Sequence, residues 1–199
     1  MSDIFLEILM CLAAAVCLMM FHECVKIIVY VICKRDKCLF RISPWKLWRY
    51  IDPVGVILAL VSYVPISRPY FFRIRDRRTN CYLGIAGLCS LLAVTVGSVL
   101  ILRECYGGLY GMNHMVLHHW WEKLLPMFVQ YVSLLSFGMM CANLIPISTF
   151  DIGLLIAGIS PRMYLGMVKS DSTIKMILVL VLLLDIIHYA AVRILVFFL

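Results

Sequence analysis

The chain has 199 residues, of which 64% are hydrophobic and 15% are charged, with a formal net charge of +7. This composition is too apolar for a soluble domain, and long uncharged runs predict membrane-spanning helices. We therefore expect a single all-α integral membrane domain over residues 1–199. Its basic segments adjoin apolar runs and carry no nucleic-acid recognition module, so they favour contact with the lipid bilayer and exclude a nucleic-acid partner.

The first apolar segment, residues 4–33, is predicted to cross the membrane. Its start is not basic and its apolar run is too long for a signal peptide, so we expect it to be retained. Deep inside it lies the sequence Phe21-His22-Glu23-Cys24-Val25-Lys26. Ionisable side chains are costly at membrane depth, and by default they indicate a functional site.

His22 and Glu23 nearly match the zinc-protease motif H-E-x-x-H. In that motif two histidines one helical turn apart bind the metal, and the glutamate acts as a base. Lys26 occupies the position of the second histidine. At 1.5 Å per residue, His22 lies about 25 Å along the segment, towards its expected cytoplasmic end.

Two basic segments, 34–50 and 68–80, flank a short apolar stretch at residues 51–67. The positive-inside rule places both basic segments in the cytoplasm and the N-terminus outside. A stretch that starts and ends on the same side does not cross, so residues 51–67 are predicted to form a re-entrant or interfacial hairpin. Its two prolines and its glycine suit an interrupted element, which must be covered by protein or face a wet cavity.

Three further apolar segments complete a predicted topology of about four transmembrane helices plus the hairpin. Residues 81–102 cross outward, residues 124–153 cross back inward, and residues 176–199 form the last span. We accordingly expect a multi-pass protein of the cell membrane. The inward-running span ends in Asn143, Pro146 and Asp151, and it brings that aspartate to the depth of the histidine–glutamate pair. A site near the cytoplasmic face is therefore predicted.

These motifs resemble the site-two protease family of zinc intramembrane metalloproteases, in its compact bacterial form. The family's H-E-x-x-H is similar to the stretch from His22 to Lys26, with the last histidine replaced. Its N-x-x-P motif, followed by an aspartate–glycine pair, is similar to the stretch from Asn143 to Asp151, with Ile152 in place of the glycine.

Two weaker matches lie between these motifs. The stretch Tyr50-Ile51-Asp52-Pro53-Val54-Gly55 resembles the family's I-D-P-x-G element, which follows the catalytic span. The stretch Ala86-Gly87-Leu88-Cys89-Ser90-Leu91 resembles its A-G-P-L-S-N helix, without the proline and the asparagine. An arginine-rich run precedes this second stretch, as it does in the family.

The resemblance implies roles for individual residues. His22 and Asp151 would bind zinc, Glu23 would activate the attacking water, and Asn143 would position the substrate backbone. Lys26 breaks this set, because a protonated ammonium has only donors and cannot bind a cation. A catalytic zinc needs about three protein ligands and one open position.

Two interpretations of Lys26 follow. Its ammonium can occupy the space of the missing metal and pair with Asp151 or Glu23, or desolvation can deprotonate it so that it acts as a ligand or base. His188 is a candidate third ligand, although a self-satisfying pair with Asp185 is the simpler interpretation.

The external histidines stand apart from the predicted site. Their four-residue spacing between His114 and His118 would suit a metal ion on a helix. The neighbouring Trp120 and Trp121 favour an interfacial belt instead.

Two functions therefore remain open. The first is a site-two-protease-like homologue with impaired or lost zinc peptidase activity, which binds transmembrane client proteins in the former substrate cleft. The second is an active zinc-dependent endopeptidase that cuts membrane-embedded substrates near the cytoplasmic face. Zinc is the expected cofactor of the active form, and the inactive form needs none.

Overall fold

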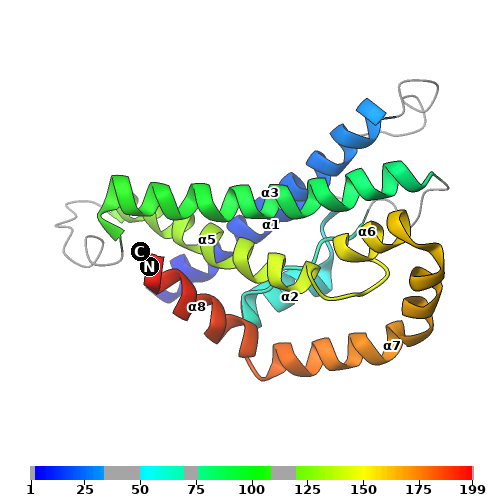
Figure 1. The fold of residues 1–199 in the computed structure, drawn as a ribbon. Coiled ribbons are helices and arrows are strands. Elements are labelled where there is room, and N and C mark those ends of the chain that lie inside the picture. Colours follow the sequence, from blue (N-terminus) through cyan, green and yellow to red (C-terminus); the bar gives the residue numbers. More distant parts are fainter. Residues whose placement is uncertain (1–2, 34–49, 70–75, 109–119, 199) are drawn as a thin grey trace.

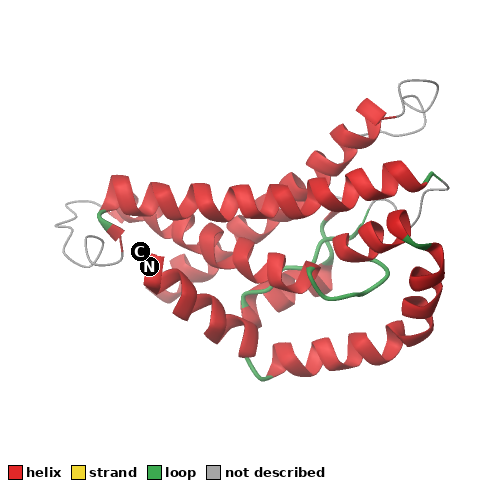
Figure 2. Cartoon of the chain, viewed as in Figure 1, coloured by secondary structure: helices red, strands yellow, loops and turns green. Residues whose placement is uncertain are grey.

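The computed structural model describes residues 3–33, 50–69, 76–108 and 120–198 (Figure 1). Every regular element in these ranges is a helix (Figure 2). Three helices are long and apolar enough to cross a membrane, and a bent pair gives a fourth crossing if it forms one span. The all-α membrane class is thus confirmed. Residues 34–49 and 70–75 of the two basic segments, and the histidines at 114, 118 and 119, lie outside the described residues.

The three long helices pack into one bundle (Figure 1). They are α1 (Asp3–Cys33), α3 (Arg77–Tyr106) and α5 (Leu124–Asn143), the last preceded by the 3₁₀ turn η2 (Trp120–Lys123). Alanine, leucine and methionine side chains fill their common core, which includes Ala14, Ala15, Leu91, Leu135 and Met139. Small residues let membrane helices approach closely, so packing replaces the hydrophobic driving force that lipid does not supply.

A polar contact also ties two of these helices together. The Thr95 hydroxyl of α3 donates to Ser136 Oγ of α5 at 2.9 Å, and both side chains are buried. Hydrogen bonds of this kind between apolar helices satisfy groups that would otherwise be stranded in a dry interior.

The segment after α1 forms a closed hairpin around the short helix α2 (Pro53–Ser62). Its 10 residues span about 15 Å, half of a hydrocarbon core of about 30 Å. The Asp52 carboxylate accepts a hydrogen bond from Val54 N at 3.1 Å and caps the helix. Arg68 N donates to Tyr50 O at 3.0 Å, so the chain returns to its starting point. The chain path is that of the predicted hairpin; its position relative to a bilayer stays a prediction.

The C-terminal third is more broken than the sequence predicts. The predicted 124–153 span ends as a helix at Asn143, and a loop leads to α6 (Asp151–Ile159). Next come α7 (Pro161–Leu183) and α8 (Ile186–Phe198), which bend by 59° where Asp185 adopts a left-handed φ of 54°. The predicted last span, residues 176–199, therefore contains this bend, and it stays a prediction that the two helices form one crossing. Hydropathy detects apolar length but does not detect this change of direction.

Close packing of α5 on the hairpin yields a test. A Cβ atom at Gly138 would lie 2.5 Å from Tyr63 O and 3.2 Å from a methyl of Val64, whereas a Cβ at Gly97 would meet nothing within 4 Å. We expect Gly138→Ala to lower the thermal unfolding temperature in detergent. The control Gly97→Ala should leave it equal or higher, because alanine is favoured over glycine in a helix by up to about 1 kcal/mol. Equal effects of the two changes would contradict the packing.

Candidate functional site

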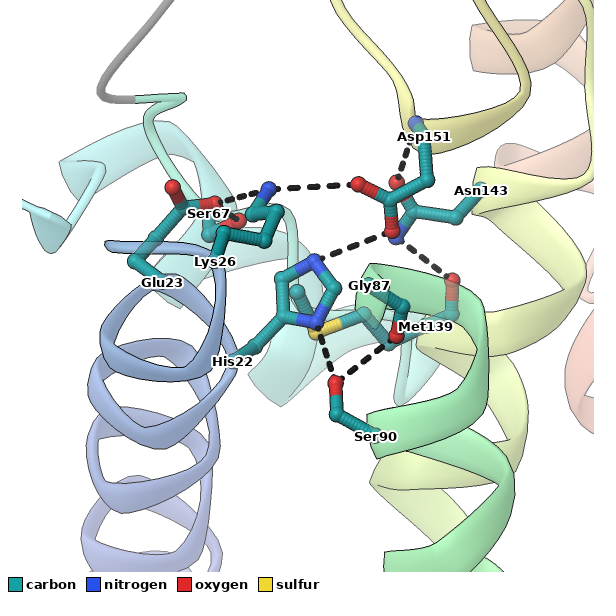
Figure 3. A network of polar contacts seen from close by, with 9 residues as sticks. All are labelled: His22, Glu23, Lys26, Ser67, Gly87, Ser90, Met139, Asn143 and Asp151. Carbon is teal, nitrogen blue, oxygen red and sulfur yellow. Dashed lines mark hydrogen bonds and ion pairs between the residues drawn. The ribbon is translucent and has the colours of Figure 1, made fainter. Parts of the chain in front are cut away.

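Three ionisable side chains of α1 meet Asp151 in the interior of the bundle (Figure 3). His22, Glu23, Lys26 and Asp151 are 0%, 1%, 6% and 0% exposed. The first three lie within five residues of α1, with Lys26 one turn after His22 and Glu23, and the aspartate begins α6. The structure therefore brings together the residues that the sequence directs to a common depth.

The Lys26 ammonium lies between two carboxylates. Its Nζ is 2.6 Å from Glu23 Oε1 and 3.2 Å from Asp151 Oδ1. A nitrogen at these distances from two buried carboxylates donates a hydrogen bond to each, and a positive charge on it offsets their negative charges. Of the two interpretations of Lys26, the geometry is that of the ion pair.

His22 is held from both sides of its ring. Its Nδ1 lies 3.2 Å from Ser90 Oγ, and the Ser90 hydroxyl donates to Gly87 O at 2.7 Å. Because that hydroxyl donates to Gly87 O, the Ser90 oxygen accepts a hydrogen bond from His22 Nδ1–H. Such a bond fixes the tautomer and the ring orientation, and it directs Nε2 towards Asp151.

The contact between His22 and Asp151 is close but incompletely satisfied. Nε2 and Oδ2 lie 3.1 Å apart, yet neither atom forms a hydrogen bond of good geometry with any described group. With a neutral imidazole, two carboxylates and one ammonium leave one negative charge uncompensated in a dry interior, which is costly. A proton on His22 or a bound cation at this point would balance it.

Asn143 supports Asp151 from the end of α5. Its Oδ1 accepts from Asp151 N at 3.4 Å, and its Nδ2 donates to Met139 O at 3.0 Å. The amide thereby holds the first residue of α6 in place. Its predicted role of positioning substrate backbone stays a prediction, since in this arrangement both ends of the amide have partners within the protein.

Sequence reasoning missed two serines at the site. Ser90 bonds His22, and Ser67, at the end of the hairpin, donates to Glu23 Oε1 at 2.8 Å. The signal for Ser90 was available, because it is a hydroxyl in an apolar span one turn from Gly87. No sequence signal connects Ser67 with α1, since only the return of the hairpin brings them together.

Two glycines of α3 make room for Asp151. A Cβ at Gly87 would lie 2.5 Å from the Asp151 carboxyl carbon, and a Cβ at Gly84 would lie 2.6 Å from its carbonyl oxygen. The aspartate thus sits directly against the α3 backbone. Glycine at these two positions therefore has a physical reason, which is the close approach of α3 and α6.

The donor set does not fit a catalytic zinc ion. His22 Nε2 and Asp151 Oδ2 present two suitable atoms, but among the described residues no three His, Cys, Asp or Glu side chains form a group that could hold a metal. His188 does not join the site, because its ring packs 4.5 Å from the Tyr63 ring. Lys26 takes the third position as a donor. About three protein ligands would be needed.

No protein-family model, curated protein or solved structure matches the chain. The resemblance to the site-two proteases therefore rests on the motifs alone.

Because the Lys26 ammonium bridges two buried carboxylates, we expect its removal to lower the free energy of unfolding strongly. Lys26→Met leaves two carboxylates buried without their cation, and breaking such a pair costs about 3–5 kcal/mol. The control is Lys175→Met, which removes a 2.6 Å pair with Asp171 whose lysine is 48% exposed. A pair of that kind contributes about 0–1 kcal/mol. Unfolding in detergent, followed by circular dichroism, should separate the two variants; equal melting temperatures would contradict the ion-pair account.

Proposed function

We propose that this membrane protein is a site-two-protease-like homologue with impaired or lost zinc peptidase activity, which binds transmembrane segments of client proteins. The supporting observation is the Lys26 ammonium, 2.6 Å from Glu23 and 3.2 Å from Asp151. It occupies the position of a metal-binding histidine in the family's motif. It also engages the two carboxylates that the resemblance assigns to water activation and metal binding.

In this proposal the former catalytic residues have a structural role. The ammonium replaces a divalent cation as the positive charge that holds the carboxylates, so α1 and α6 remain joined. Glu23 is further engaged by Ser67 at 2.8 Å, which ties the hairpin to the same point. A base that is bonded to a cation and a hydroxyl is poorly placed to accept a proton from water.

Binding of transmembrane segments follows from the resemblance, since the family acts on membrane-embedded clients. A homologue that retains the helix arrangement but lacks the set of zinc ligands would still bind client segments but would not cleave them. We further propose that the protein lies in the cell membrane with its N-terminus outside and the site near the cytoplasmic face, as the basic segments indicate.

One observation favours the alternative, an active zinc endopeptidase. His22 Nε2 and Asp151 Oδ2 are buried, 3.1 Å apart and without good hydrogen bonds, as two ligands facing a shared cation would be. Activity would then require Lys26 to leave its carboxylates or to lose its proton. The two proposals differ directly in metal content.

Metal content is the first test. We expect elemental analysis of the purified protein to find well under one zinc per chain. The variant Lys26→His restores two histidines one turn apart and should approach one zinc per chain, while the neutral control Lys26→Gln should not. Stoichiometric zinc in the unaltered protein, lost in His22→Ala or Asp151→Asn, would overturn the proposed loss of the zinc site.

Client binding is the second test. A fluorescently labelled single-span peptide in detergent should bind the unaltered protein and remain intact by mass spectrometry. Lys26→His should bind it with similar affinity and cleave it in the presence of zinc, because only the ligand set has changed. Absence of peptide binding would defeat the client proposal, and chelator-sensitive cleavage by the unaltered protein would defeat the loss of activity.

A further inference from the structure

A cavity of about 370 Å³ lies between α3, α5 and α8, away from the buried ionic site. Its walls are almost wholly apolar and include Leu92 and Val96 of α3, Met140 of α5, and Leu195 and Phe198 of α8. These helices include two of the candidate membrane spans and part of the bent pair. The molecules that surround such a groove in a bilayer are lipids, whose chains are as apolar as the walls.

The length of the groove matches one leaflet. It runs along α3 from Leu92 to Arg103, a rise of about 16 Å. Half of the hydrocarbon core of a bilayer is about 15 Å thick. The one hydroxyl in the wall, that of Thr95, is bonded to Leu91 O and Ser136 Oγ, both at 2.9 Å, so it offers the ligand no proton. The groove therefore suits an extended acyl chain and not a polar ligand.

Two charged residues, Arg103 and Glu104, lie at one end of the groove. Arg103 lines the cavity where the uncharged part of α3 stops, which is where a headgroup would lie. Its guanidinium matches phosphate oxygens in geometry and charge. Glu104 is next to it, with Oε1 4.0 Å from Arg103 Nε, and both side chains are largely exposed. Glu104 itself lies outside the lining, so at this end of the groove the cation in the wall has one anion beside it.

We propose that this groove binds one phospholipid with a primary-amine headgroup, of the phosphatidylethanolamine class. Its acyl chain lies along α3 against α5 and α8, its phosphate contacts Arg103, and its ammonium donates to Glu104. A glycerol headgroup has no cation for that carboxylate, and a choline headgroup has no N–H to donate. The charge pair therefore selects among phospholipids, whereas the apolar groove alone would not.

The test is lipid retention in native mass spectrometry. The protein is released from nanodiscs containing equimolar ethanolamine, choline and glycerol phospholipids with identical chains. One ethanolamine lipid should remain bound in preference to the others. Arg103→Gln should weaken retention of all three about tenfold, as expected for a lost charge-assisted phosphate contact. Glu104→Gln should abolish the preference for ethanolamine and keep retention.

A matched pair of variants tests the groove itself. Val96→Trp fills the groove and should eliminate the retained lipid, whereas Ile101→Trp should not, because it lies outside the lining of the groove on the same helix. The two residues are 49% and 47% exposed, so both changes place a tryptophan on an accessible surface. Equal retention in the two variants, or no preference among headgroups in the unaltered protein, would show surface lipid only and overturn the proposal. The exposed Arg103→Gln change gives a readout even if Val96→Trp does not fold.

Discussion

The ammonium of Lys26 in a dry interior is the contact on which the rest of the site depends. A buried carboxylate is tolerated only with a partner, and this cation serves two carboxylates that are far apart in the sequence. Its bond to Glu23 is made within α1, but its bond to Asp151 spans 125 residues and requires α6 to lie against α1 and α3. The packing of α6 therefore brings Asp151 to the cation that offsets its buried charge.

The backbone is adapted to that contact. Gly84 and Gly87 let α6 reach α3 without a Cβ atom between them, and Asn143 holds the Asp151 amide from the end of α5. The hairpin around α2 returns to its start and brings Ser67 to Glu23. α1 therefore contributes three groups to the ionic cluster, and Ser90 of α3, Asn143 of α5, Asp151 of α6 and Ser67 of the hairpin contribute one each. The cluster adds polar contacts to the apolar packing between these elements.

The proposed loss of peptidase activity follows from a single side chain in this arrangement. Position 26 lies one turn after His22 and faces Asp151. In the proposal, the side chain at this position determines whether the site binds a metal ion or holds an ammonium in its place. A histidine there would offer a lone pair, and lysine offers protons. The proposed lipid groove shares α3 and α5 with the ionic site but uses other residues and a separate pair of charges, so each proposal can fail without the other.

The sequence by itself determined the class of the protein and the local geometry of the motif. Apolar length predicts helices, and a period of 3.6 residues puts His22 and Lys26 on one face. Only the tertiary structure decided which carboxylates the lysine meets, that Ser67 and Ser90 complete the site, and that the last apolar segment breaks at Asp185. The physical reason is range: periodicity and hydropathy are local properties, whereas these contacts depend on helices packing across the bundle.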